Sequence, residues 1–244
     1  MNAFGKSHEG MLRENNEDTV FVSNEPLGPL PNAYIVSDGM GGHSSGEIAS
    51  QKSVAFFCEY ARSHSAEPED LLDYMVAAAR YANTQVFELS LTDPALNGMG
   101  ATFTACTAAG GKLIIAHIGD SRIYHIVNGT IRQITTDHSY VSELIRSGQI
   151  TASQARTHPQ KNVLTKALGV EASVEVDGAL YDTGGQGLAL LCSDGLSNML
   201  TEDQILRIVR GKNSMSEKTD LLVAEANRRG GLDNISVILL DMTR

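Results

Sequence analysis

The sequence has few cysteines, and their placement limits the fold classes open to it. The three cysteines, Cys58, Cys106 and Cys192, lie in runs of small or apolar residues and form no CxxC pair. An odd number cannot be fully paired within one chain, so we expect buried free thiols in a reducing, cytoplasmic setting. A small secreted fold held together by disulfides is disfavoured.

Positive charge and long apolar runs are also scarce. Lys and Arg number 19 against 29 Asp and Glu, which gives a net charge of -10. This charge repels the phosphate backbone that dominates nucleic-acid affinity, so DNA and RNA are poor candidate partners. No stretch approaches the roughly 18 apolar residues that cross a bilayer, and the first residues lack the apolar core of a signal peptide, so no membrane partner is expected.

What the sequence does contain is a regular series of short apolar runs separated by Gly, Asp and Asn. With 244 residues and 42% hydrophobic residues, the chain can bury a sizeable core, and we expect one domain over residues 1–244. The runs predict strands, several of them joined by hairpin turns. They are TVFVS (19–23), AYIVS (33–37), TFTACTA (102–108), KLIIAHI (112–118), RIYHIV (122–127), LALLCS (188–193) and ISVILL (235–240).

Helical patterns come in pairs between groups of these strands. Apolar residues at helical spacing predict helices over Gly46–Ser63 and Pro68–Ser90, and two amphipathic helices over Thr201–Arg210 and Glu217–Arg229. Residues 137–169 are more polar and contain short helical stretches, so we interpret them as an inserted, mobile helical flap. This grouping of strands and helices predicts a layered α+β architecture.

Aspartates recur at the ends of the predicted strands. Asp38, Asp120 and Asp194 each directly follow a strand and lie beside a Gly or Ser, whereas Asp18 and Asp233 directly precede one. Taken singly, each Asp-Gly has a plain explanation as a turn. Strand ends of a sandwich meet at a common edge, however, and carboxylates gathered there would repel one another unless cations neutralised them. The set therefore predicts a metal site.

The ligand type favours Mg²⁺ or Mn²⁺. No cysteine or closely spaced histidine pair accompanies the aspartates, so hard, oxygen-binding ions are expected rather than zinc. Two such ions in an oxygen-rich site activate a bridging water and hold a phosphoryl group during in-line displacement. The glycines Gly39, Gly41 and Gly42 let the backbone approach an ion closely, although a GMGG run matches neither a P-loop nor a dinucleotide fingerprint. Hydrolysis of a phosphate ester is indicated.

Eight sequence blocks follow one another along the chain: RENNED, VSDGMGGHSSGE, MGATFTA, AHIGDSRIY, DHSYVSELIRSGQIT, HPQKNVLTKALG, LLCSDGLSNML and GGLDNISV. In this order they resemble the bacterial branch of the type 2C, or PPM, metal-dependent serine/threonine protein phosphatases. The resemblance covers nearly the whole chain. It implies a four-layer α-β-β-α sandwich, in which helix pairs flank two central antiparallel sheets and a channel at one edge holds two metals.

The resemblance also implies roles for the acidic residues. Asp38 would bridge both ions and the carbonyl of Gly39 would complete one of them. Asp194 and Asp233 would hold the other ion, and Asp120 would share a third, weaker ion with Asp194. The remaining residues of the set would support the ligands or bind through water: Asp18, Glu17 and Asn234.

Two further residues take catalytic roles by the same resemblance. Arg13 matches the arginine that binds the substrate phosphate, and a planar guanidinium can grip phosphate oxygens through two parallel hydrogen bonds. His43 either protonates the leaving oxygen or plays a structural or water-holding part. Many animal members carry a histidine directly after the Asp-Gly, where this chain has Met40, so both roles stay open. Asp137, His138 and Ser139 begin the flap, which is our candidate for substrate selection.

The predicted reaction is hydrolysis of phosphoserine and phosphothreonine in proteins by a hydroxide held between the ions, without a phosphoenzyme. The partners would be phosphoproteins, with a bacterial serine/threonine kinase possible among them. Three alternatives remain: a phosphatase of small molecules, a pseudophosphatase that serves as a binding module, and a nucleotide-binding switch. The presence of Asp38, Asp194 and Asp233 disfavours the second, and a panel of phosphopeptides and metabolites separates the first.

Overall fold

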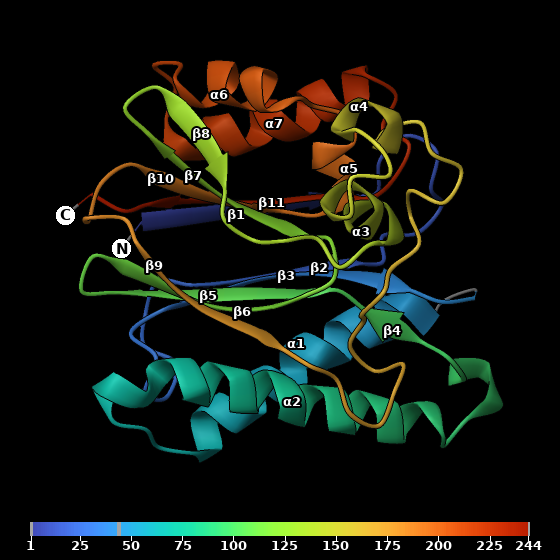
Figure 1. The fold of residues 1–244 in the computed structure, drawn as a ribbon. Helices are drawn as coiled ribbons and strands as arrows, with labels where there is room; N and C mark the ends of the chain where they lie inside the picture. Colours follow the sequence, from blue (N-terminus) through green and yellow to red (C-terminus); the bar gives the residue numbers. More distant parts are fainter. Residues whose placement is uncertain (1, 43–44, 244) are drawn as a thin grey trace.

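Two antiparallel sheets packed face to face form the centre of the protein, and helices cover the outer face of each (Figure 1). The computed structural model describes residues 2–42 and 45–243. Helices α1 (Ser45–Ser63) and α2 (Leu71–Ser90) lie below the sheets in Figure 1, and α6 (Glu202–Val209) and α7 (Met215–Arg228) lie above them. The predicted α+β, four-layer α-β-β-α sandwich is confirmed.

Each sheet combines strands from distant parts of the chain. The five-stranded sheet has the order β1-β11-β10-β7-β8, and the six-stranded sheet has the order β2-β3-β5-β6-β9, with β4 paired to β3. The strands of the first sheet are β1 (Asn2–His8), β7 (Arg122–Val127), β8 (Thr130–Gln133), β10 (Leu188–Cys192) and β11 (Ile235–Asp241). Those of the second are β2 (Asp18–Ser23), β3 (Ala33–Met40), β4 (Gly100–Ala101), β5 (Phe103–Ala109), β6 (Lys112–Ile118) and β9 (Asp177–Asp182).

Most strands that were predicted as apolar runs are buried on both faces, whereas β2, at the edge of its sheet, is half-buried along most of its length. Along β11, Ile238 and Leu240 pack between the two sheets, whereas Val237 and Leu239 pack against the α6–α7 layer. This follows from the two-residue period of a strand, which sends alternate side chains to opposite faces. Because both faces lie against apolar neighbours, the sequence reads as a continuous apolar run rather than as an alternating one.

Local capping explains where the later helices begin. Thr201 caps α6 and Ser214 caps α7, each in a capping box completed by Gln204 or Glu217 three residues on. The predicted range for α6 was one residue too long at each end, whereas that for α7 began two residues late and ended one residue late. At α2 the prediction began too early, because Pro68 opens a short 3₁₀ turn, Pro68–Asp70, and the α-helix proper begins at Leu71.

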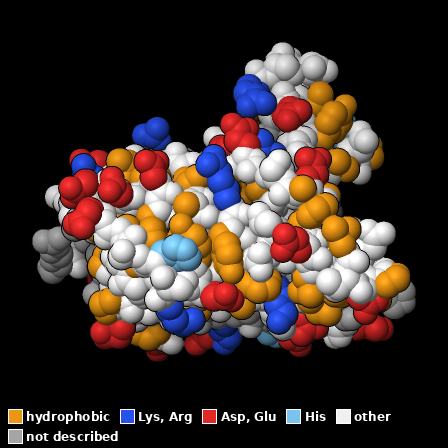
Figure 2. Space-filling model, turned by 90° about the horizontal axis from the view of Figure 1, so that it is seen from below, with side chains coloured by type: hydrophobic (Ala, Val, Ile, Leu, Met, Phe, Trp, Pro, Cys, Tyr) orange, Lys and Arg blue, Asp and Glu red, His pale blue; other side chains and the backbone are white. Residues whose placement is uncertain are grey.

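The predicted flap contains two short helices, α3 (Tyr140–Arg146) and α4 (Ala152–Ala155). In the view from below, a lobe stands out from the body of the molecule on the side where Figure 1 shows α3 and α4 (Figure 2). The remaining short elements are η2 (Pro94–Leu96) and α5 (Asp194–Ser197).

The cysteines agree with their sequence context. Cys58, Cys106 and Cys192 are free and buried, as predicted. Burial raises the pKa of Cys58 to about 11 and of the other two thiols to about 12. In the part of the chain that the structure describes, no helix is both long enough and apolar enough to cross a membrane.

Candidate metal centre

A polar cleft of about 260 Å³ gathers most of the residues predicted for the metal site. It lies at one end of the two sheets, where β2 and β11 begin, β3 and β10 end, and β6 turns into β7. Its lining residues are Arg13, Glu17, Asp38, Gly39, Met40, Gly41, Thr102, Asp120, Asn162, Leu164, Asp194 and Asp233. Segments more than two hundred residues apart in sequence thus contribute to one cleft.

The pairing of β2 with β3 sets two of the carboxylates against each other. In this antiparallel pair Asp18 lies directly opposite Asp38. Directly opposed residues project from the same face of a sheet with their Cβ atoms about 5 Å apart. Asp38 lines the cleft, whereas the buried Asp18 is not among the lining residues of the described chain. This arrangement is compatible with the expectation that Asp18 acts through bound water, which stays a prediction.

Gly39 is required by close packing of the backbone. A Cβ atom at this position would lie 2.0 Å from the carbonyl oxygen of Gly46 and 2.7 Å from that of Glu17. The amide of Gly39 donates to the Glu17 carbonyl at 3.1 Å. The first turn of α1 and the loop before β2 therefore press directly on the Asp38–Gly39 peptide, which explains the glycine better than a turn does.

Thr102 fixes the backbone of Asp38 from the other side. Its hydroxyl accepts from the Asp38 amide at 2.9 Å, and its own amide donates to the Asp38 carbonyl at 2.8 Å. The same hydroxyl lies 2.8 Å from the hydroxyl of Ser121, the residue after Asp120. Thr102 thus links the Asp38 strand to the turn that carries Asp120.

Asp194 opens α5 immediately after β10. One of its carboxylate oxygens accepts from Asn198 at 3.0 Å, and the other, Oδ1, is buried without a hydrogen-bond partner in the described structure. Asp18 shows the same pattern, since Oδ2 accepts from Ser193 at 2.7 Å and Oδ1 is buried without a partner. Buried carboxylate oxygens without partners are costly unless a cation or a proton satisfies them.

Asn234 joins the N-terminal loop to the start of β11. Its side-chain oxygen accepts from the Glu17 amide at 2.8 Å, and its amide group donates to the carbonyls of Glu9 and Asn15, each at 2.8 Å. This connection brings Arg13 beside Asp233, to which its guanidinium donates at 2.9 Å. Asn234 therefore supports the site without lining the cleft.

The carboxylates destabilise one another's charged forms. Burial, followed by repulsion from Asp18 and Asp194, raises the pKa of Asp38 well above its ordinary value. Burial followed by repulsion from Asp194 raises the pKa of Asp120 likewise. Burial raises the pKa of Asp18 to about 7 despite the hydrogen bond from Ser193, and burial with repulsion from Asp233 raises that of Asp194 to about 6. Near neutral pH, a nearby positive charge would stabilise the ionised forms of these four aspartates.

The donor set fits hard divalent ions that keep part of their water. Within residues 2–42 and 45–243, no three His, Cys, Asp or Glu side chains form the cage of a single ion. Mg²⁺ does not require such a cage, since it is usually bound by one or two carboxylates and retains several waters. The partnerless oxygens of Asp18 and Asp194 and the Gly39 carbonyl offer the oxygen ligands that these ions prefer.

The residues predicted at the start of the flap lie at its base, where His138 and Ser139 are buried and Asp137 is half-buried. Arg122 donates to Asp137 through Nε and Nη2, the latter at 2.6 Å. The amide of His138 donates to the Gly119 carbonyl at 2.8 Å, and its Nδ1 accepts from the Gly119 amide at 3.1 Å. Ser139 caps α3. These contacts anchor the flap next to the Asp120 turn, while a direct part in substrate selection stays a prediction.

One predicted catalytic residue and several lining residues need separate mention. His43 lies outside the residues that the structure describes, so its role stays a prediction. Thr102, Asn162 and Leu164 also line the cleft, but they were not predicted as site residues from the sequence. They fall within the blocks MGATFTA and HPQKNVLTKALG, so the resemblance contained a signal for them, but no charge or spacing marked them individually.

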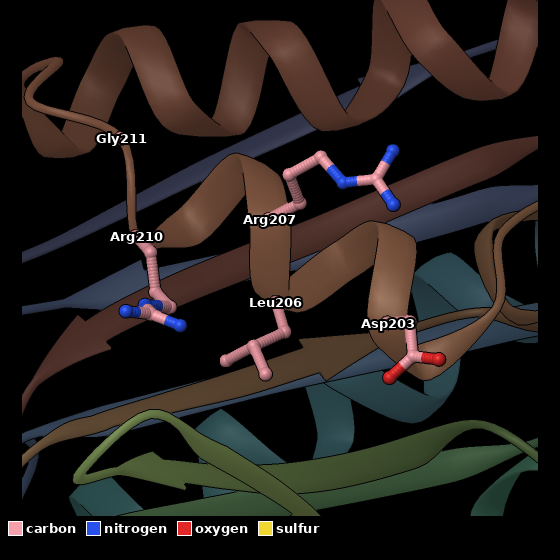
Figure 3. Close-up of a pocket in the computed structure, with 5 residues that line it drawn as sticks. All are labelled: Asp203, Leu206, Arg207, Arg210 and Gly211. Carbon is pink, nitrogen blue, oxygen red and sulfur yellow. The ribbon is translucent and has the colours of Figure 1, made fainter.

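A larger hollow lies elsewhere and lacks the chemistry of the cleft. It has a volume of about 560 Å³ and is lined by Asp203, Leu206, Arg207, Arg210 and Gly211 on and after α6. The side chains of Arg207 and Arg210 diverge rather than converge on one point, with Arg207 extending to the right and Arg210 downward in the view (Figure 3). Size therefore does not identify the site here, and the clustered carboxylates do.

Comparison with known proteins finds relatives of this chain along nearly its whole length. The family profile described as "Protein phosphatase 2C" matches residues 4–226. The chain is 39% identical to the serine/threonine phosphatase stp of Listeria welshimeri, covering 99% of this chain and 96% of that one. The crystal structure of the serine/threonine phosphatase PstP/Ppp of Mycobacterium tuberculosis superposes with a TM-score of 0.88 at 34% identity, covering 100% of this chain and 99% of that one.

A further structure carries metal. The catalytic domain of the serine/threonine protein phosphatase PstP, solved in complex with two manganese ions, superposes with a TM-score of 0.83 at 33% identity. The alignment covers 98% of this chain and 97% of that domain.

Proposed function

The chain belongs to the protein phosphatase 2C family, and from that premise we propose that it hydrolyses phosphoserine and phosphothreonine in proteins in a single step. It is a metal-dependent serine/threonine protein phosphatase of the bacterial PPM type, with Mn²⁺ or Mg²⁺ as its cofactor. One observation carries the mechanistic proposal: carboxylates from five separate segments meet at one cleft, and an arginine stands at its edge.

The acidic residues would hold the ions as their positions suggest. Asp38 and the Gly39 carbonyl would bind at the centre, Asp194 and Asp233 at one side, and Asp120 at a further, weaker site. Asp18 would act through water behind Asp38. When bound, two divalent ions supply an activated water and neutralise the charge that develops on the phosphoryl oxygens.

Protein side chains would bind the phosphate and protonate the leaving oxygen. Arg13 lines the cleft and is half exposed, so its guanidinium can turn from Asp233 toward a phosphate. A phosphoenzyme would need a protein nucleophile; the described lining residues include no Cys, Ser or His, and the lining aspartates are the proposed ligands of the ions. The hydroxyl of Thr102 is already engaged with Asp38 and Ser121. His43 is our candidate for protonating the leaving oxygen, with a structural role as the alternative.

Replacing Arg13 tests its proposed grip on phosphate. We expect Arg13→Ala to lower kcat/KM for a phosphothreonine peptide by about 10²-fold, since a charged donor to the transferring group is lost. The kcat/KM of Arg13→Lys should lie between those of Arg13→Ala and the wild type, because lysine keeps the positive charge but lacks the planar guanidinium. Steady-state kinetics at saturating Mn²⁺ measure both, with the exposed Arg132→Ala as a control. Equal activity of the Ala variant and wild type would contradict the assignment.

The proposed activity is tested by a substrate panel. Phosphoserine and phosphothreonine peptides, an aryl phosphate and a set of phosphorylated metabolites are incubated with EDTA, Mg²⁺ or Mn²⁺. Ion-dependent turnover with a preference for phosphopeptides supports the proposal, whereas a preference for metabolites supports a small-molecule phosphatase. Rapid acid quenching with labelled phosphopeptide should trap no labelled protein if hydrolysis is a single step. Phosphoproteins made by a serine/threonine kinase of the same cell are the proposed partners.

A further inference from the structure

A second groove opens directly off the catalytic cleft, and we call it the side groove. It has a volume of about 340 Å³ and shares two lining residues, Met40 and Leu164, with the cleft. Its lining residues are Met40, Leu164, Thr165, Lys166, Ala167, Val170, Glu171, Ser173, Val174 and Glu175. The two hollows therefore adjoin at Met40 and Leu164.

The distance between cleft and side groove suits a bound peptide. Asp38 and Met40 belong to the same strand, β3, and are separated only by Gly39. At about 3.3 Å per residue, Met40 lies about 7 Å along the strand from Asp38. An extended peptide covers the same distance in about two residues. A side chain one or two positions from the phosphorylated residue can therefore reach the side groove.

A glycine keeps the floor of the side groove closely packed. Gly100 lies opposite Met40 in the β3–β4 pair. A Cβ atom there would lie 2.6 Å from Val170 Cγ2 and 2.9 Å from Met40 Cε. Met40 and Val170 thus converge over Gly100 and form an apolar floor that is continuous with the strand carrying Asp38.

The walls combine apolar surface with excess negative charge. Val170 is 41% exposed, and Leu164, Ala167 and Val174 add further apolar lining. Lys166 is the groove's cation, and its Nζ contacts Glu175 at 2.7 Å and Asp177 at 3.4 Å, so two carboxylates already neutralise it.

The carboxylate of Glu171 adds to the negative charge of the side groove. This residue is exposed and has no ion-pair partner among the residues that the structure describes. Such a site suits a side chain with a long apolar stem and a positive end, because the stem covers the apolar floor while the charge meets the carboxylates.

We propose that the side groove binds an arginine or lysine side chain of the substrate, one or two residues from the phosphoserine or phosphothreonine. The proposal rests on the phosphoprotein phosphatase activity proposed above and specifies which phosphoproteins the site accepts. A basic residue close to the phosphorylation site distinguishes a preferred substrate from a poor one.

The test uses phosphothreonine peptides with a single arginine placed one, two or three positions before or after the phosphothreonine. Citrulline, which has the shape of arginine without its charge, replaces it in a matched set. We expect kcat/KM to rise about fivefold with arginine over citrulline at one or two adjoining positions on one side, a gain of the size of a partly exposed ion pair. An equal gain at every position would indicate only the general negative charge of the protein and would overturn the proposal.

Charge reversal in the groove provides the second arm. Glu171→Lys should abolish or invert the arginine preference while turnover of an aryl phosphate stays near wild type. Glu25→Lys is the matched control, since Glu25 is also exposed and follows the far end of β2. An unchanged preference in Glu171→Lys would contradict the proposal. If the wild type hydrolyses aryl phosphate but no phosphopeptide, the proposed function itself fails, which is a different outcome.

Discussion

Asp38→Asn is expected to reduce kcat/KM for a phosphothreonine peptide by about 10³-fold or more at saturating Mn²⁺. The carboxylate lies at the centre of the cleft, opposite Asp18 and beside the Gly39 carbonyl. Asparagine keeps the shape of the side chain but removes the charge with which Asp38 would hold the ions. Steady-state kinetics over a range of Mn²⁺ concentrations measure both the loss and any shift in the ion requirement.

The same substitution is expected to stabilise the metal-free protein. In the folded chain the pKa of Asp38 is raised well above its ordinary value by burial and by the neighbouring aspartates, so its charged form opposes folding near neutral pH. Removing that charge should raise the Tm in EDTA by several degrees, at about 2 to 4 °C per kcal/mol for a chain of this size. Addition of Mn²⁺ should then raise the Tm less than it does in the wild type.

A loss of activity together with a higher Tm of the metal-free protein distinguishes a metal site from a cluster with a purely structural role. Asp203→Asn serves as the control, since Asp203 is exposed at the start of α6 and is not among the residues that line the cleft. It should change neither activity nor the response to Mn²⁺. A lower Tm for Asp38→Asn in EDTA, or full activity of this variant, would contradict the assignment.

The predictable part of the fold is the part buried on both sides. Strands such as β5 and β10 were predicted because nearly every residue in them is apolar or small and buried. The helices were found from the helical spacing of their apolar residues, and Thr201, where the α6 prediction began, is the N-cap of that helix. In these segments the requirements of burial and the local pattern agree, so the sequence alone suffices.

Two edge strands, β1 and β9, escaped prediction for the converse reason, although the edge strand β2 was predicted. β1 and β9 lie at the edges of the two sheets, and most of their residues are exposed or only half-buried. Without a buried face an edge strand needs no apolar pattern, and charges on it protect the sheet from unwanted pairing. Asp177 and Asp182 at the two ends of β9 are of this kind. Their pairing comes from tertiary context that a local pattern does not carry.

The candidate site likewise has a part that the sequence predicts, the aspartates, and a part that it does not, the residues that support them. Its aspartates could be found because carboxylates at strand ends are conspicuous, and the register of β2 against β3 explains why Asp18 and Asp38 had to meet. The supporting contacts of Thr102 are between segments distant in sequence, as are those of Asn234. Nothing in their local sequence distinguishes a hydroxyl or amide that holds a metal ligand from one that faces water.

Removal of divalent ions should make the stability of the protein fall as the pH rises. The pKa of Asp18 is raised to about 7 and that of Asp194 to about 6, both chiefly by burial. A raised folded-state pKa means that the native protein binds more protons than the unfolded chain between about pH 4 and pH 7, so stability decreases with pH in that window. For Asp18 alone the cost by pH 8 is on the order of 4 kcal/mol, which corresponds to a Tm lower by about 10 °C.

Thermal unfolding in EDTA at about pH 5.5 and pH 8 measures this effect, and Mn²⁺ should reverse it because bound cations replace the missing protons. The reversal should be larger at pH 8, where the carboxylates are ionised and ready to bind, and should grow with ion concentration as expected for a ligand that binds only the native state. Asp38→Asn should flatten the pH dependence by removing one member of the repelling group, whereas Asp203→Asn should leave it as in the wild type. If the metal-free protein were instead more stable at pH 8 than at pH 5.5, the buried aspartates would have to find their compensation within the protein, and a cation would not be needed to hold them together.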